Sequence, residues 1–102
     1  MNRRSYILLA LLFLNLFVWL GVSAATPSAE LKVAFLDIGQ GDSILIESPT
    51  GGQVLIDGGS GRQVLRALGK QMAFSDRFID VVIATHPDAD HIGGLPSVLE
   101  RY

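Results

Sequence analysis

The sequence predicts an α/β fold that follows a separate apolar N-terminal segment. Short apolar runs bounded by glycine and proline predict strands, and a stretch with apolar residues at helical spacing predicts a helix between them. The 102 residues allow one small domain, and a hydrophobic content of 49% excludes disorder. The chain has no cysteine, which excludes a disulfide scaffold and thiolate metal ligands, and its net charge of −2 argues against a dedicated nucleic-acid-binding module.

The first 24 residues have the organisation of an export signal. Residues 1–6 carry two arginines and no acidic residue, residues 7–22 are almost entirely apolar, and small residues precede a cleavage point after Ala24. This order is typical of a secretory signal peptide. The alternative is an uncleaved anchor that enters the membrane through residues 7–22. Either interpretation predicts a protein that is exported to the periplasm or the exterior, or held at the membrane by its N-terminus.

A short linker at 25–30, rich in small residues, precedes the predicted domain at 31–102. Residues 31–38 are apolar on both alternating faces, which predicts a strand that is covered on both sides. Residues 43–57 predict a hairpin, because two apolar runs flank a turn cluster of serine, proline, threonine and glycine.

The chain is predicted to continue as a helix, a buried strand, a loop and a second helix. Residues 62–73 have an apolar helical face, and residues 79–85 form an apolar run that predicts the buried strand. A loop at 86–94 follows, and Pro96 fits the first turn of the next helix. This helix is unfinished at Tyr102, so we expect the chain to hold only the N-terminal part of a larger α/β domain.

Basic residues recur every four positions along the first of these helices, at Arg62, Arg66 and Lys70. A row of this kind could contact phosphate groups, and the alternative is a solvated helix face. The solvated helix face explains this row better.

Four potential metal ligands fall within six residues, directly after the predicted strand at 79–85. They are His86, Asp88, Asp90 and His91, and they include both histidines of the chain. Neutral imidazoles and carboxylates are the ligands that divalent cations such as zinc or manganese take in proteins. The alternative is a polar loop in which an aspartate caps the next helix. An EF-hand calcium loop is excluded, because Ile92 and Leu99 stand where oxygen ligands are needed.

The pattern His-x-Asp-x-Asp-His-x-Gly-Gly at 86–94 resembles the metal motif of metallo-β-lactamase-fold hydrolases. FLDIGQGDS at 35–43 and LIDGG at 55–59 resemble motifs of one branch of these hydrolases, the ComEC-type competence (DNA-uptake) proteins and their stand-alone relatives. The resemblance covers residues 31–102. It implies an αββα sandwich of which only the N-terminal part is present.

The resemblance also implies a two-metal site. His86 and Asp88 would serve one ion, and Asp90 and His91 the second. Asp90 would also act in catalysis by orienting the nucleophile. Asp57 would lie near the site and support the ligands without binding an ion itself. The alternative for this residue is a turn cap before Gly58-Gly59.

The implied cofactor is a pair of divalent ions, with zinc expected and manganese as the alternative. Asp88 stands where the general family has histidine, and a harder oxygen ligand favours manganese. The implied reaction is attack by a metal-bound hydroxide on an ester, an amide or a phosphodiester. The substrate is open, with DNA or another phosphodiester as the candidate suggested by the competence branch, and no protein partner is indicated.

The four ligands in this loop fall short of the number that a two-metal site needs. The family takes its other ligands from later segments. We therefore expect either a hydrolase of which this chain is a fragment, or a non-catalytic fragment that binds metal weakly or not at all.

Overall fold

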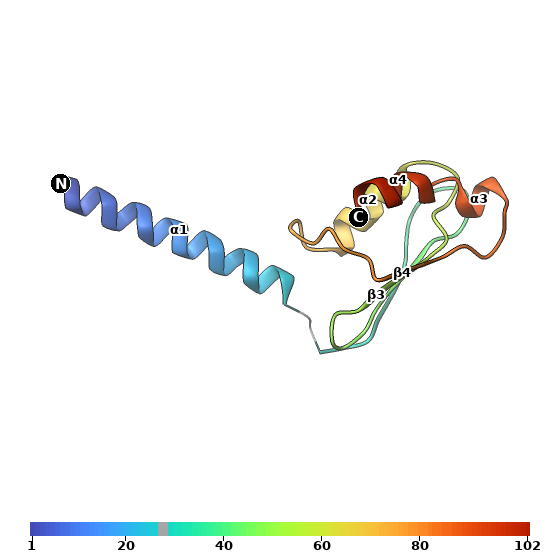
Figure 1. The fold of residues 1–102 in the computed structure, drawn as a ribbon, viewed down its shortest axis with the longest axis horizontal. Helices are drawn as coiled ribbons and strands as arrows, with labels where there is room; N and C mark the ends of the chain where they lie inside the picture. The colour runs from blue at the N-terminus through green and yellow to red at the C-terminus, as the bar shows by residue number, and fades with distance from the viewer. Residues whose placement is uncertain (27–28) are drawn as a thin grey trace.

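The computed structural model describes residues 1–26 and 29–102 and contains a long N-terminal helix followed by a small α/β unit (Figure 1). The elements, in chain order, are α1 (Arg3–Ala25), β1 (Lys32–Phe35), β2 (Ile44–Glu47), β3 (Gln53–Ile56), α2 (Gln63–Gln71), β4 (Val81–Ile83), α3 (Ala89–Ile92) and α4 (Leu95–Arg101). The predicted α/β class is therefore confirmed, and the element order matches the prediction.

The four strands form one sheet in the order β1-β2-β3-β4. β1 pairs with β2 and β2 with β3 in antiparallel fashion, so the hairpin predicted at 43–57 is present. β4 pairs parallel to β3, after a connection that contains α2. The ends of β3 and β4 consequently lie at the same edge of the sheet, and the candidate ligands follow β4 there.

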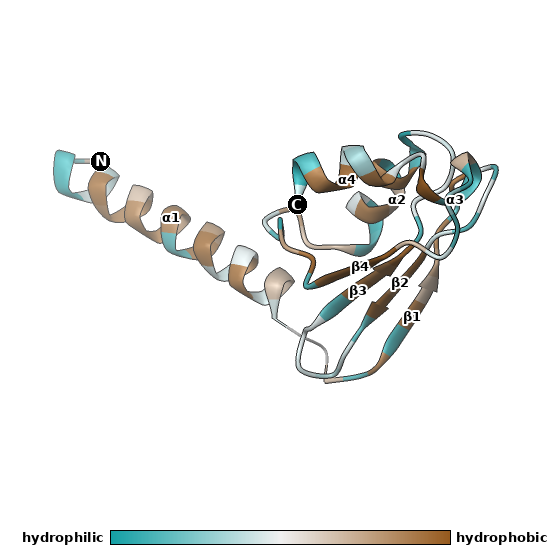
Figure 2. Ribbon diagram, turned by 45° about the vertical axis from the view of Figure 1, so that its right-hand side comes forward, coloured by the Kyte–Doolittle hydropathy of each residue, from teal (hydrophilic) through white to brown (hydrophobic). Residues whose placement is uncertain are grey.

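The core lies between the sheet and the helices α2 and α4, which cover the same face of it (Figure 2). One row of residues runs across all four strands on this face, and Leu45 and Leu55 at its centre are buried. Val64 and Leu68 of α2 and Val98 of α4 are fully buried against them. The apolar face of α2 that the sequence predicts therefore packs on the sheet, while its basic residues remain exposed.

The opposite face of the sheet is apolar and, within the described residues, is not covered by another layer. Two further rows cross the four strands on this face, Val33-Ile46-Val54-Val81 and Phe35-Ile44-Ile56-Ile83. Phe35 is 79% exposed and Val81 is 47% exposed. The predictions that the strand at 31–38 is covered on both sides and that the strand at 79–85 is buried are thus wrong for the described residues, because α2 and α4 pack on one face only.

The helix α1 is longer than the predicted apolar core at 7–22 and includes Ala24, after which cleavage is predicted. None of its residues is buried, and the side chain of Asn2 caps its first turn by accepting a hydrogen bond from the Ser5 amide at 2.9 Å. By length and composition α1 could cross a membrane, which is equally expected of a signal sequence. The predicted linker at 25–30 lies partly outside the described residues, since 27 and 28 are not described.

The loop predicted at 86–94 contains a short helix, α3. Its first residue follows Asp88, whose carbonyl accepts hydrogen bonds from the amides of His91 and Ile92 at 3.0 Å. The next helix begins at Leu95, one residue before the predicted Pro96, which occupies its first turn as expected.

We predict that Gly94→Ala lowers the free energy of unfolding by about 1–3 kcal/mol. A Cβ at this position would collide with the carbonyl oxygens of Gly58 and Gly61, and would lie 2.8 Å from a methyl group of Val64. Chemical denaturation of the detergent-solubilised chain, followed by circular dichroism, measures the change.

The matched control is Gly69→Ala in α2, where a Cβ would meet no atom within 4 Å. This substitution should raise the stability by about 0.5–1 kcal/mol, because alanine is the better helix former. A G94A variant as stable as the wild type would contradict the close approach of these backbones.

Candidate metal centre

The candidate site lies at the edge of the sheet where β3 and β4 end. Asp57 directly follows β3, and its amide donates a hydrogen bond to the carbonyl of Ile83, the last residue of β4, at 2.8 Å. Thr85 and His86 follow β4, and α3 then brings His91 back toward Asp57. The parallel pairing of the two strands therefore brings together residues that are about thirty positions apart in the sequence.

The carboxylate of Asp57 is buried and accepts three hydrogen bonds. Its Oδ1 accepts from the amide of Thr85 at 2.8 Å. Its Oδ2 accepts from the hydroxyl of Thr85 and contacts Nδ1 of His91 at 3.0 Å. The residue is only 3% exposed, so these donors replace the water that an exposed carboxylate would bind. The alternative in which Asp57 caps its own turn is not what the structure shows, because its side chain bonds to Thr85 and His91.

The backbone of Asp57 is held in the left-handed region, with φ of 60°. Few residues other than glycine adopt this conformation, although aspartate and asparagine tolerate it best. Its carbonyl accepts a hydrogen bond from the buried hydroxyl of Ser43 at 2.8 Å, which ties it to the start of β2. Contacts from two strands thus keep Asp57 in a conformation that turns its carboxylate toward α3.

The glycine-rich turns after β1 and β3 hold α3 through its backbone. The amide of Gly58 donates to the carbonyl of His91 at 2.7 Å, and the amide of Asp42 donates to the carbonyl of Asp90 at 3.3 Å. Gly41 has φ of 94°, and a Cβ there would collide with the carbonyl of Asp90. The glycines of the 35–43 and 55–59 motifs therefore allow the close approach that positions the candidate ligands.

The charges of Asp57 and His91 stabilise one another. Burial acts to raise the pKa of Asp57, but the hydrogen bonds from Thr85 and His91 outweigh this effect and hold the pKa below its ordinary value of 3.8. The hydrogen bond to Asp57 raises the pKa of His91 above its ordinary value against partial desolvation, and the charges of Asp90, Asp57 and Asp42 add to this increase. Asp57 is consequently an anion at neutral pH, and its carboxylate accepts in each of its hydrogen bonds.

Both histidines have one ring nitrogen committed to a neighbour inside the protein. Nδ1 of His91 contacts Asp57, and Nδ1 of His86 lies 3.0 Å from the hydroxyl of Thr85. The two ring centroids are 4.8 Å apart. The Nε2 atoms remain for another partner, and metal-binding histidines usually have this arrangement, in which the second ring nitrogen bonds to a carboxylate or another protein group. The residues present therefore fit a divalent ion in donor type and in the support of the donors.

The two aspartates of the motif are exposed. Asp90 lies with Oδ2 3.9 Å from Nε2 of His91, so these two predicted ligands of one ion are neighbours. Asp88 occupies the N-cap position of α3 but makes no capping hydrogen bond with its side chain. The cap that the alternative interpretation requires is therefore not formed at Asp88.

The predicted ligands are gathered only in part. The structure brings His91 close to His86, Asp90 and Asp57. Within residues 1–26 and 29–102, no three histidine, aspartate or glutamate side chains are close enough together to hold one ion. The metal-ligand and catalytic assignments of the four motif residues therefore stay predictions.

Thr85 is the site residue that sequence reasoning missed. It is the last residue of the predicted strand at 79–85, yet its amide and hydroxyl both bond to Asp57, and its hydroxyl also contacts His86. The available signal was its position, since it is a hydrogen-bonding residue directly before a candidate ligand and directly after an apolar run.

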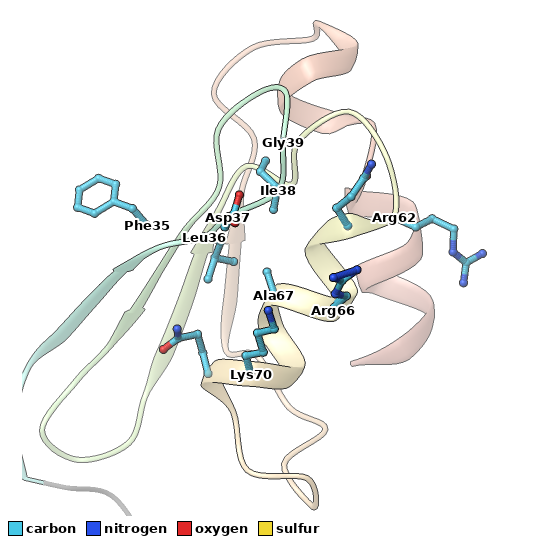
Figure 3. Close-up of a pocket in the computed structure, with 11 residues that line it drawn as sticks. Phe35, Leu36, Asp37, Ile38, Gly39, Arg62, Arg66, Ala67 and Lys70 are labelled. Carbon is cyan, nitrogen blue, oxygen red and sulfur yellow. The ribbon is translucent and has the colours of Figure 1, made fainter.

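A separate groove of about 490 Å³ lies between α2 and the segment after β1 (Figure 3). Arg62, Arg66 and Lys70 line it from the helix, and Asp37 and Ile38 lie on the other side. Asp57 and the four motif residues do not line this groove. The basic row is exposed and is therefore distinct from the candidate metal centre.

Comparison with known proteins agrees with the fold and the motifs. Residues 36–102 match the model of the Metallo-beta-lactamase superfamily. The chain is 48% identical over 56 residues to a protein named ribonuclease Z from Clostridium kluyveri, and 43% identical over 58 residues to one of the same name from Aeropyrum pernix; these matches cover 54% and 56% of this chain. It is 34% identical over 92 residues to ComE operon protein 3 of Bacillus subtilis, a match that covers 74% of this chain. No solved structure gives a significant match.

The structure is that of an α/β protein, and the family match covers more than half of the chain. The chain belongs to the metallo-β-lactamase superfamily. The predicted resemblance to this superfamily and to its competence-protein branch is confirmed. The chain spans less than a fifth of the length of these curated relatives, namely 17% of each ribonuclease Z and 12% of ComE operon protein 3.

We predict that Asp57→Asn lowers the free energy of unfolding of the metal-free chain by about 1–3 kcal/mol at neutral pH. Asparagine tolerates the same backbone conformation, but its amide group would face a donor where the carboxylate accepts. Because the pKa of Asp57 is lowered in the fold, its contribution is present above pH 3.8 and is lost as the pH falls through the lower folded value. Denaturation at neutral and acidic pH should show the difference between the two proteins shrink in acid.

The control is Asp88→Asn, which changes the same functional group at an exposed position with no capping bond. Its stability should stay within about 0.5 kcal/mol of the wild type. Equal losses for D57N and D88N would contradict a special role for the buried carboxylate.

Proposed function

We propose that this chain is part of a metal-dependent hydrolase that cleaves phosphodiesters. The observation that carries the proposal is the pair of histidines whose Nδ1 atoms bond to Asp57 and Thr85, so that both Nε2 atoms are left for an ion. Hydrogen bonds that orient imidazoles in this way are typical of metal centres. The superfamily membership supports a divalent metal as the cofactor.

His86 and Asp88 would hold one ion, and Asp90 and His91 the other, with zinc expected and manganese as the alternative. When bound, such ions supply Lewis-acid activation of water and stabilise negative charge on the attacking and leaving oxygens. The residues of this chain supply the donors and their orientation. Asp90, as an exposed carboxylate beside His91, would orient the attacking water and accept its proton.

Two of the relatives are named as ribonucleases, and the third is named as the product of a ComE operon. The first name supports a phosphodiester as the bond that is cleaved, with nucleic acid as the substrate class. The net charge of −2 supplies no attraction for a polyanion by itself. The substrate proposal therefore depends on the relatives and on the chemistry of the ligand set.

A second candidate is a non-catalytic chain that binds metal weakly or not at all. The observation that favours it is the incomplete gathering of ligands, since within the described residues no three donors lie together. The two candidates differ in whether the chain retains a stoichiometric ion and whether that ion supports turnover.

We predict that the protein produced from its gene, purified in detergent, hydrolyses bis-p-nitrophenyl phosphate with added Zn²⁺ or Mn²⁺. A chelator should abolish the activity, and His86→Ala should lower it by about 100-fold or more, on the scale of losing a residue that takes part directly in catalysis. Glu100→Gln, an exposed change on α4, is the control and should retain the wild-type rate.

An H86A variant with the wild-type rate, or activity that survives the chelator, would overturn the hydrolase proposal. Elemental analysis of the same preparation separates the candidates. Stoichiometric metal together with turnover excludes the non-catalytic chain, whereas absence of both supports it.

We further propose that residues 1–24 export the protein or anchor it in the membrane, and that residues 31–102 form the N-terminal part of an αββα sandwich. The apolar composition and full exposure of α1 support the first statement. The uncovered apolar rows of the sheet support the second, because exposed apolar surface of this extent normally belongs to an interface between layers.

We predict that the protein fractionates outside the cytoplasm or with the membrane when it is expressed in its own host. Mass spectrometry of the recovered protein should find an N-terminus at Ala25 if α1 is a cleaved signal, and an intact N-terminus if it is an anchor. A variant with Leu11→Arg and Leu14→Arg should remain in the cytoplasm, since charge in the apolar core prevents insertion. Recovery of the unaltered chain from the cytoplasm would contradict the export proposal.

A further inference from the structure

Thr85 lies outside the three motifs at 35–43, 55–59 and 86–94, but it contacts residues of two of them. Its hydroxyl contacts two groups at once, namely Oδ2 of Asp57 and Nδ1 of His86. Its amide is held separately by Oδ1 of Asp57 at 2.8 Å, so the backbone at this position cannot shift without breaking a hydrogen bond to a buried carboxylate. Thr85 therefore lies between the carboxylate and the first histidine of the motif.

The direction of each hydrogen bond in this cluster follows from counting protons. An ionised carboxylate has no proton and can only accept. The single proton of the Thr85 hydroxyl must then point to Asp57, because otherwise two oxygen lone pairs would face each other at hydrogen-bond distance. The hydroxyl has only lone pairs left for His86, so the proton of that contact must come from Nδ1 of the histidine.

The second histidine follows the same rule. Nδ1 of His91 lies 3.0 Å from the same Oδ2 of Asp57, so this nitrogen must also carry a proton. The two donors converge on one carboxylate, His91 directly and His86 through the Thr85 hydroxyl. In its neutral form each ring consequently has its free lone pair on Nε2, the nitrogen that does not contact Asp57 or Thr85.

We propose that Thr85 is a positioning residue that extends the influence of Asp57 to His86 and sets the tautomer and ring orientation of that histidine. The acceptor side of the hydroxyl holds Nδ1–H, and the lone pair of Nε2 is thereby presented for binding. This inference rests on the proposed function in one respect, namely that a metal ion is the partner of Nε2. The proton positions can be tested in the absence of any metal.

The test uses the two imidazole rings of the chain, which are its only histidines. The 102-residue chain, labelled with ¹⁵N at histidine and treated with a chelator in detergent micelles, is measured by long-range ¹H–¹⁵N correlation at about pH 8.5, where imidazole is mostly neutral. The wild type should show both rings protonated at Nδ1. A His86→Ala spectrum assigns the two ring systems.

Thr85→Val removes the hydroxyl at nearly constant volume, and Thr85→Ser retains it. In T85V, His86 should change to the Nε2–H form that free imidazole in histidine prefers, while His91 keeps Nδ1–H through Asp57. In T85S both rings should match the wild type. The signal of His91 also shows whether the variant has kept its fold, since an unfolded chain would lose the Nδ1–H form at both rings.

A wild-type His86 that carries its proton on Nε2 overturns the inference, even if T85V fails to fold. A folded T85V whose His86 still carries the proton on Nδ1 also overturns it.

Calorimetric titration with Zn²⁺ alone adds the second readout. T85V should bind Zn²⁺ about 10-fold more weakly, within the range seen when a residue that hydrogen-bonds to a metal ligand is removed. T85S should bind Zn²⁺ within about 2-fold of the wild type. Equal zinc affinity in T85V and the wild type would overturn the positioning role. A wild type that binds no zinc would instead support the non-catalytic candidate for this chain, and the proton positions would then decide the role of Thr85.

Discussion

The carboxylate of Asp57 is the group on which the arrangement of the candidate site depends. It is buried at the end of β3, and it bonds to Thr85, two residues after the end of β4, and to a histidine on α3. A buried anion is tolerated only when donors surround it, so the segments that carry these donors must remain in place for the chain to stay folded. The order of the histidines is therefore linked to the stability of the fold, because the same hydrogen bonds serve both.

The helix α3 shows how little of this site is stable by itself. Four residues are too few for an independent helix, since nucleation is unfavourable and the few hydrogen bonds of such a short helix do not offset its cost. Its position comes from the amides of Gly58 and Asp42, which reach its carbonyls, and from the contact of His91 with Asp57. The two glycine-containing turns that hold it are thus part of the site.

The features that could be predicted from the sequence are the local ones. The hairpin at 43–57 and the helix at 62–73 follow from turn residues and apolar spacing, and both are present with boundaries within two residues. Whether a second layer covers the strands at 31–38 and 79–85 could not be predicted. An apolar run shows that a surface favours burial, but it does not show whether another element of the chain packs on that surface. The role of Thr85 depends on the parallel pairing of β3 with β4, which joins positions 28 residues apart and leaves no periodic pattern in the sequence.

The left-handed backbone of Asp57 places two contributions to stability in opposition at one position. An L-residue in this conformation loses roughly 1–2 kcal/mol relative to an ordinary one, and glycine would relieve that strain. Glycine would also remove the acceptor that His91 and Thr85 share, and donors left without a partner in the fold lower stability again. The change in stability of a glycine variant would therefore understate the loss of imidazole order, because relief of the backbone strain conceals part of the cost.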